Sequence, residues 1–267
     1  MTCPACSSGA VLFDFETPRL KVWKCRSCGH RLAQHLAVES LLDYHQQYDQ
    51  GAFVDSLRAT RVRQARRILG WIREAEPAAT RLLDYGCGRG WFLDEAKAAG
   101  WQVAGADSSP MAVQMLRDRG IAAVDLDRPI ESEVVTLLDV IEHFTVEELV
   151  PRLSAVRARV VVIKVPTSEG LLYRFARGRA LEQMYQVGTY PPHHHYFNRR
   201  SLRHVLARAG MQPLGFHRDR DFEPSTVAAR AGLHFPLAGV AGSVAAAAAA
   251  LLRMEDSLIS LARPRAS

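Results

Sequence analysis

The chain has 267 residues, of which 48% are hydrophobic and 23% charged, and its formal net charge is +6. This length is near the upper range for a single hydrophobic core, and the composition is ordinary for a soluble globular protein. Much of the positive charge comes from arginines scattered over expected helices, which indicates a solvated face rather than a nucleic-acid footprint. The charge alone therefore excludes no class of partner and selects none.

The N-terminal part contains two C-x-x-C pairs, Cys3 with Cys6 and Cys25 with Cys28, separated by a stretch that can form a β-hairpin. This spacing suits four thiolates around one tetrahedral Zn²⁺. Two disulfides fit less well, because we expect no signal peptide ahead of Cys3 and a cytoplasmic location keeps thiols reduced. Since sulfur fills all four coordination positions, we predict a structural Zn²⁺ in a zinc ribbon over residues 1–35.

Residues 36–76 are predicted to form a mainly helical connector. Apolar residues recur at helical spacing in its second half and indicate a helix packed on a sheet, namely Val62, Ile68, Leu69 and Ile72. Three aromatic residues lie in its first half, namely Tyr44, Tyr48 and Phe53. We interpret them as core-packing residues, with closure over a bound ligand as the alternative.

A glycine-rich turn is the most informative part of the chain. A short apolar strand ending at Asp84 is followed by Gly86-Cys87-Gly88-Arg89-Gly90, and a helix is expected from Trp91. Glycines at alternate positions let the backbone take positive φ and approach a ligand closely, and the first amides of the helix face the same space. The pattern D-x-G-x-G-x-G differs from the G-x-G-x-x-G of dinucleotide folds. It predicts a cradle for a different cofactor.

Further apolar runs without alternation indicate a parallel sheet that is covered on both faces. The second strand ends at Asp107, at about the offset where a carboxylate accepts hydrogen bonds from ribose hydroxyls. The remaining runs predict the third to fifth strands at 121–126, 134–138 and 160–165, with a helix at 201–209.

The glycine pattern resembles motif I of the class I S-adenosylmethionine (SAM)-dependent methyltransferases. In addition, Asp139-Val140-Ile141-Glu142-His143 follows the fourth strand and resembles motif IV of the small-molecule branch of that family. The resemblance covers about residues 81–217. It implies a Rossmann-like, doubly wound, mainly parallel α/β sheet in a SAM-binding domain over residues 77–232.

The resemblance also implies roles for individual residues. In the family the acidic residue lies near the ammonium group of the ligand, the glycines make room for its methionine and ribose portions, and residues just past the third strand contact its adenine. The cofactor-binding residues expected on this basis are Asp84, Gly86, Cys87, Gly88, Gly90, Asp107, Ser108, Asp125, Leu126 and Asp139. For Cys87, a small packing residue is favoured over any nucleophilic role.

The segment at about 167–198 departs from regular periodicity and follows the fifth strand, so it overhangs the carboxyl edge of the sheet, where open α/β folds bind ligands. Its aromatic and basic side chains suit a lid over a partly anionic or aromatic substrate. It also contains His193, His194 and His195. On an extended segment His193 and His195 share one side, so at most two of the three can act together.

Methyl transfer from a sulfonium needs positioning and removal of a proton from the acceptor, and an imidazole is the obvious base. His143 is the first candidate, followed by His193 and His195. The cluster Asp139-x-x-Glu142-His143 is also similar to the E-x-x-E-H cluster of ubiquinone-biosynthesis O-methyltransferases and small-RNA ribose methyltransferases, which helps to bind a divalent ion. Because Asp139 stands where those families have Glu, a catalytic divalent metal, completed by a histidine of the triplet, is the less favoured interpretation.

The C-terminal segment 233–267 is predicted to be helical. Residues 235–252 are uncharged and rich in alanine, and a buried or dimer-forming helix is favoured over attachment to a membrane surface. The family usually ends with a hairpin of a sixth and a seventh strand. On this basis residues 211–217 supply the sixth, and residues 225–230 are the candidate for the seventh.

Together these features predict a cytoplasmic enzyme that transfers a methyl group from SAM to a hydroxyl of a small molecule or of a glycan- or lipid-linked intermediate. A zinc ribbon before this fold also resembles the deoxysugar C-methyltransferases, so carbon methylation stays open. RNA methylation is disfavoured as a rival. Methylation of exocyclic base nitrogens is disfavoured separately, because no Pro-Pro-aromatic sequence follows the fourth strand. A rival of another class is a non-catalytic scaffold that docks a protein through the ribbon.

Overall fold

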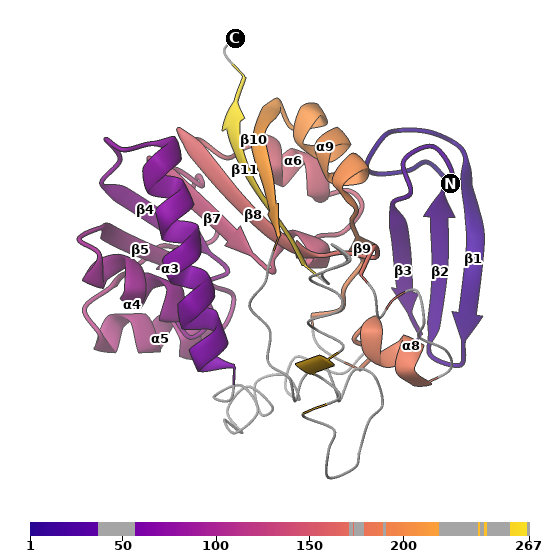
Figure 1. Ribbon diagram of the computed structural model, residues 1–267, viewed down its shortest axis with the longest axis horizontal. Coiled ribbons are helices and arrows are strands. Elements are labelled where there is room, and N and C mark those ends of the chain that lie inside the picture. The colour runs from indigo at the N-terminus through magenta and orange to yellow at the C-terminus, as the bar shows by residue number, and fades with distance from the viewer. Residues whose placement is uncertain are drawn as a thin grey trace.

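The computed structural model describes residues 1–36, 57–170, 173, 179–188, 191–218, 240, 243–244 and 257–265 (Figure 1). Its largest element is a seven-stranded sheet in the order β10-β11-β8-β7-β4-β5-β6. The strands are β4 (Arg81–Tyr85), β5 (Gln102–Ala106), β6 (Ala122–Ala123), β7 (Val134–Leu138), β8 (Val160–Pro166), β10 (Met211–Arg218) and β11 (Ser257–Pro264). Neighbouring strands from β8 to β6 pair in parallel, whereas β11 is antiparallel to both β8 and β10.

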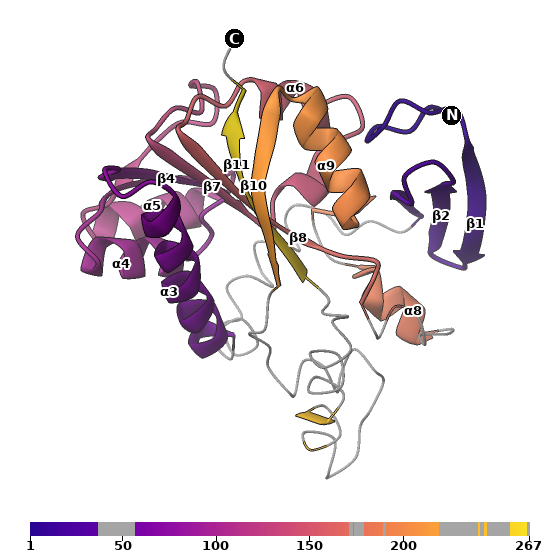
Figure 2. The same cartoon turned by 45° about the horizontal axis from the view of Figure 1, so that its top comes forward.

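Helices cover both faces of this sheet, as Figures 1 and 2 show. On one face lie α3 (Arg58–Ala75), α4 (Trp91–Ala98) and α5 (Pro110–Asp118), and on the other α6 (Leu149–Ser154) and α9 (Arg199–Arg208). Every residue of β8 is buried, and alternate valines of β7 and β8 enter the two cores. The continuous apolar strands thus have the environment that a parallel sheet requires, which confirms the predicted fold class.

The zinc-ribbon region forms a second sheet, in the order β1-β2-β3-β9. Its strands β1 (Val11–Thr17), β2 (Leu20–Cys25) and β3 (Arg31–His35) are antiparallel neighbours, and β9 (His195–Tyr196) pairs antiparallel with β3. One face of this sheet packs against the region of α8 (Arg179–Met184). Figures 1 and 2 show α8 next to the ribbon strands. The ribbon sheet is therefore completed by a strand from the segment that follows β8.

The C-terminal prediction was wrong in part, because residues 257–264 of the expected helical segment form strand β11. Leu258-Ile259-Ser260-Leu261-Ala262 is a short apolar run, and periodicity alone does not distinguish a buried strand of this length from a buried helix. Residues 257–264 form a strand because they pair with β8 on one edge and with β10 on the other. The candidate seventh strand at 225–230 lies outside the described residues, as do Tyr44, Tyr48 and Phe53. None of the helices that are described has the length and apolarity needed to cross a bilayer.

Candidate functional site

The glycine turn connects β4 to α4 with three residues in the left-handed region. The φ angles of Gly86, Gly88 and Gly90 are 80°, 50° and 71°. The Gly86 amide donates to the Ala106 carbonyl at 2.7 Å, which ties the turn to the end of β5. A Cβ added at Gly86 would lie 2.4 Å from a methyl carbon of Val140. Both the backbone angle and this close approach therefore require glycine at position 86.

Asp84 is the penultimate residue of β4, two positions before Gly86, and is only 3% exposed. Its carboxylate accepts a hydrogen bond of 2.6 Å from the Thr136 hydroxyl on β7. Burial raises the pKa of Asp84 to about 7, and the charge of Asp107 adds to this rise, whereas the bond from Thr136 opposes it. This acid therefore titrates near neutrality.

Asp107 follows β5 and links the glycine turn to α5. One carboxylate oxygen accepts from the Gly88 amide at 2.7 Å, and the other accepts from the Ser109 amide at 2.9 Å. The Ser109 side chain in turn caps α5 by accepting from the Ala112 amide at 3.3 Å. Two predicted cofactor residues, Asp107 and Gly88, are thus in direct contact.

The other residues predicted near the cofactor have less specific surroundings. Cys87 is buried, and burial raises the pKa of its thiol, which suits packing rather than nucleophilic chemistry. Ser108 is exposed, next to Asp107. Asp125 is also exposed, whereas Leu126 is half-buried against the core. Position alone associates Asp125 and Leu126 with the site.

Asp139 has a positive φ of 59° and lies between two cations. Lys164 Nζ lies 2.5 and 2.7 Å from its two carboxylate oxygens, and a guanidinium nitrogen of Arg61 lies 2.6 Å from one of them. Burial raises the pKa of Asp139, but the charges of Lys164 and Arg61 outweigh it and hold that pKa well below its usual range. The protein's own cations therefore neutralise this carboxylate.

Neither Lys164 nor Arg61 was predicted from the sequence as a site residue. Lys164 is 3% exposed and interrupts the apolar run of β8. A lysine inside an otherwise apolar strand needs an anionic partner. The position of Lys164 in the sequence could therefore have indicated an ion pair.

Glu142 and His143 lie in the short 3₁₀ turn η1 (Ile141–His143) after β7 and converge with His193. One potential ligand atom of each residue lies within 4.8 Å of those of the other two. The rings of His143 and His193 meet edge to face, with centroids 4.5 Å apart. The predicted motif IV and the predicted histidine triplet are thus brought together, 50 residues apart in sequence, through His193.

Glu142 is fully buried, and neither of its carboxylate oxygens has a hydrogen-bond partner among the described residues. Burial raises its pKa well above the ordinary value, and the charge of Asp139 adds to this rise. Burial therefore favours the neutral form of this carboxyl group unless a cation joins it.

His143 has a defined tautomer because its Nδ1 lies 3.2 Å from the carbonyl oxygen of Pro192. A carbonyl only accepts, so Nδ1 carries the hydrogen and Nε2 carries the lone pair. Burial lowers the pKa of His143 to about 4, although the Pro192 carbonyl and Asp139 oppose this shift. The ring is therefore neutral at pH 7, with a nitrogen that can accept a proton.

His195 is not part of this group. It is fully buried, and its Nδ1 lies 3.1 Å from Nε2 of His30 in the ribbon. His194 is half-buried, and its amide donates to the Glu142 carbonyl at 2.7 Å. The three adjacent histidines thus have three different sets of contacts.

The four ribbon cysteines converge. The sulfur atoms of Cys3 and Cys28 are 3.6 Å apart, those of Cys6 and Cys25 are 3.7 Å apart, and all four lie within 4.8 Å of one another. Tetrahedral zinc with bonds of about 2.3 Å to sulfur needs sulfur atoms roughly 3.8 Å apart. The donor set therefore fits a structural Zn²⁺.

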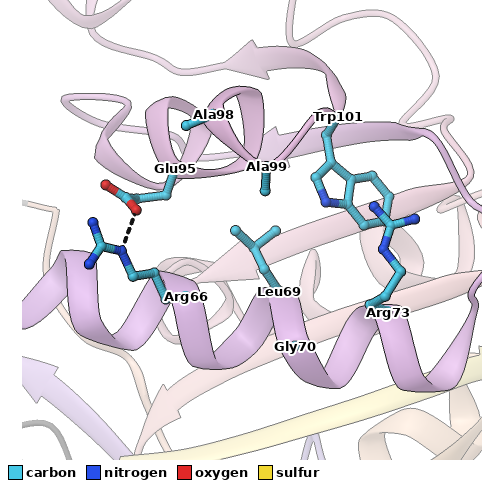
Figure 3. A pocket seen from close by; sticks show the side chains of 8 residues that line it. All are labelled: Arg66, Leu69, Gly70, Arg73, Glu95, Ala98, Ala99 and Trp101. Carbon is cyan, nitrogen blue, oxygen red and sulfur yellow. Dashed lines mark hydrogen bonds and ion pairs between the residues drawn. The ribbon is translucent and has the colours of Figure 1, made fainter.

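A groove of about 400 Å³ lies elsewhere, between α3 and α4 (Figure 3). An ion pair of 2.6 Å between Arg66 and Glu95 borders it, and the guanidinium of Arg73 lies 4.3 Å from the ring centroid of Trp101. The groove adjoins the C-terminal half of α4, whereas the glycine turn is at the N-terminus of that helix. It is thus separate from the site described above.

Comparisons with known proteins agree with the fold. A family model described as a methyltransferase domain matches residues 57–214. A search of curated proteins found no match to the chain.

Solved structures resemble the fold at low identity. Magnesium protoporphyrin IX methyltransferase from Synechocystis, with bound S-adenosylhomocysteine (SAH), has a TM-score of 0.53 at 16% identity, covering 84% of this chain and 94% of that one. A SAM-dependent methyltransferase from Archaeoglobus fulgidus has a TM-score of 0.50 at 18% identity, with coverages of 77% and 94%. Geranyl diphosphate C-methyltransferase from Streptomyces coelicolor has a TM-score of 0.50 at 15% identity, with coverages of 76% and 80%.

Proposed function

The chain belongs to the class I SAM-dependent methyltransferases, and we propose that it methylates a hydroxyl group of a small molecule or of a glycan- or lipid-linked intermediate. The observation that carries this proposal is the group formed by Glu142, His143 and His193 after β7. It follows the carboxyl end of that strand, the edge where open α/β sheets bind ligands. The names of two similar structures, which act on a porphyrin and on geranyl diphosphate, favour a small molecule.

The glycine turn and its neighbours would hold SAM, which supplies a methyl group already activated on a sulfonium. We assign Asp84 to its ammonium group, the three glycines to its methionine and ribose portions, and Asp107 with Ser108 to its ribose hydroxyls. Asp125 and Leu126 are assigned to its adenine. Asp139 is assigned to the pocket wall, because Lys164 and Arg61 already neutralise it.

The first testable consequence concerns pH. The folded pKa of Asp84 is raised to about 7, so this carboxyl must lose a proton before it can pair with an ammonium group. We expect SAH affinity to fall by up to about tenfold per pH unit as the pH drops below 7, and to level off above it. Calorimetry from pH 5.5 to 8 measures this slope. Asp84→Asn should bind weakly with no such slope, and an equal slope in that variant would contradict the assignment.

His143 is the proposed general base. The Pro192 carbonyl fixes Nδ1 as a donor, so Nε2 would take the proton from the acceptor hydroxyl as the methyl group is transferred. The low pKa of His143 makes the ring a weak base that is neutral throughout the physiological range. Proton loss must therefore accompany methyl transfer rather than precede it. His193 would contact the same acceptor from the neighbouring strand segment.

A divalent ion at this group is a second candidate, favoured by the convergence of one carboxylate and two imidazoles. This donor set suits a divalent transition metal, which would polarise the acceptor hydroxyl. Asp139 would not be a ligand. Strong chelation that removes activity while zinc stays in the ribbon would support the ion. Full activity under the same conditions, with one zinc per chain by elemental analysis, would exclude it.

The acceptor atom is tested on the product. Label from SAM methyl is incorporated into a small-molecule extract, and the product is heated in hydriodic acid. This treatment releases a methyl group on oxygen as volatile methyl iodide and leaves a methyl group on carbon in place. Released label is the expected result. Retained label would favour the alternative of sugar C-methylation.

A further inference from the structure

The segment at 191–198 that carries His193 is held by the zinc ribbon on one side. Strand β9 pairs with β3, with Tyr196 opposite Arg31 and His195 opposite Leu32. The Ala33 amide extends this pairing by donating to the His194 carbonyl at 2.9 Å. A strand of two residues has too few hydrogen bonds to hold its own conformation, so the position of β9 depends on β3.

His35 at the end of β3 makes a contact that the proposed reaction does not use. Its Nε2 lies 3.0 Å from the carbonyl oxygen of His193, and the residue is buried. Because a carbonyl only accepts, Nε2 of His35 must carry the hydrogen and donate it. This bond fixes the peptide group of the residue whose ring contacts His143.

Motif IV holds the same segment on the other side. The His194 amide donates to the Glu142 carbonyl at 2.7 Å, and Nδ1 of His143 donates to the Pro192 carbonyl at 3.2 Å. The backbone from Pro192 to His194 is thus hydrogen-bonded both to the catalytic turn and to the ribbon. Displacement of the ribbon would change the approach of His193 to His143.

Two further residues, Glu182 and Asn198, connect the ribbon with the parts of the chain on either side of this segment. Glu182 of α8 accepts from the Thr17 hydroxyl at 2.6 Å and from two nitrogens of Arg19 at 3.2 and 3.0 Å. The Asn198 side chain, which caps α9, donates to the Cys28 carbonyl at 3.0 Å. Cys28 is a predicted zinc ligand, so the metal-binding turn itself contacts the end of the segment.

We propose that the zinc ribbon positions the acceptor site, and that His35 is the positioning residue that sets the place of His193. The ribbon strands are too few to build a core alone, so zinc binding supplies their folding free energy. Zinc held by the four cysteines would thus influence methyl transfer only through the position of β3 and β9, without touching the reacting atoms. The expected effect on methyl transfer rests on the proposed function, whereas the expected effect of the ribbon on the position of residues 191–198 does not.

The test compares His35→Phe, which removes the donor, with His35→Gln, which keeps one. Arg31→Gln is the matched control, because the Arg31 side chain pairs with Asp14 inside the ribbon at 2.8 Å. Amide hydrogen exchange of the peptide 191–198, SAH affinity, zinc content and the rate of label transfer into a small-molecule extract are measured on the full chain.

For His35→Phe we expect faster exchange in 191–198 and a roughly 10- to 100-fold slower transfer rate, with SAH affinity and zinc content unchanged. His35→Gln should recover most of the rate, and Arg31→Gln should resemble the wild type. Unchanged exchange in His35→Phe, or equal damage in all three variants, would overturn the proposal.

A measurement on the wild type covers the case in which His35→Phe does not fold. Removing zinc from the wild-type chain with a chelator should raise exchange in 191–198 while β7 and β8 stay protected. Equal protection of 191–198 with and without zinc would overturn the proposal. Hydrogen exchange is measured without a methyl acceptor, so a chain that methylates some other group would still show the change in 191–198. Failure of the proposed function can therefore be distinguished from failure of the positioning role.

Discussion

Gly86→Ala should lower the affinity for SAH by roughly 100-fold or more, which corresponds to about 2.7 kcal/mol. The added Cβ would lie 2.4 Å from Val140, and alanine is strained at a φ of 80°. Relieving the contact requires the turn or Val140 to shift, and either shift would change the shape of the cradle proposed for the cofactor. Calorimetric titration with SAH measures the loss.

Two variants separate this effect from general damage. A Cβ at Gly70 in α3 meets no described atom within 4 Å, so Gly70→Ala should bind SAH like the wild type. Adding Val140→Ala to Gly86→Ala removes the methyl group in the way and should restore part of the affinity, but not the part lost to backbone strain. Wild-type affinity in Gly86→Ala would show that the turn does not hold the cofactor.

His143→Ala is the second prediction with a large effect. The variant should transfer methyl groups roughly 10²- to 10⁴-fold more slowly, the range for loss of a general base. SAH affinity should stay within about twofold, because His143 lies after β7 and not in the glycine turn. His204→Ala, at an exposed histidine of α9, is the control. A transfer rate in His143→Ala close to that of the control would contradict the role of His143.

Glu142→Gln then distinguishes a base from a metal site. Without an ion, burial favours the neutral form of Glu142, and glutamine has nearly the same shape and charge as that form, so activity should survive. As a ligand of a divalent ion, Glu142 must be ionised, and the same substitution should remove most of the activity. Single-turnover transfer rates with and without added Mn²⁺ provide this comparison.

The sequence was sufficient for the parts of the molecule that depend on local chemistry. The apolar runs of β4, β7 and β8 predicted a parallel sheet, and Gly86, Gly88 and Gly90 do take positive φ. The four cysteines converge as their spacing indicated. Each of these features rests on neighbouring residues whose properties can be read directly.

Features that depend on contacts between residues far apart in sequence could not be predicted as well. The sequence could not show that β9 joins the ribbon sheet, and therefore that His193 turns to His143 while His195 turns to His30. The ion pairs of Asp139 join α3, β7 and β8, which only the folded chain brings together. Strand β11 was mistaken for helix because its pairing partners, not its own pattern, decide its conformation.

The most direct test of the central claim is transfer of labelled methyl groups from SAM into an extract of the source organism by the full chain. The products are separated into RNA, protein, lipid and small-molecule fractions, with His143→Ala as the slow control. We predict label in the small-molecule or lipid fraction, and roughly 100-fold less or lower still with the control over the same time. Label in nuclease-sensitive material would contradict the proposed function and make the zinc ribbon an RNA-binding module.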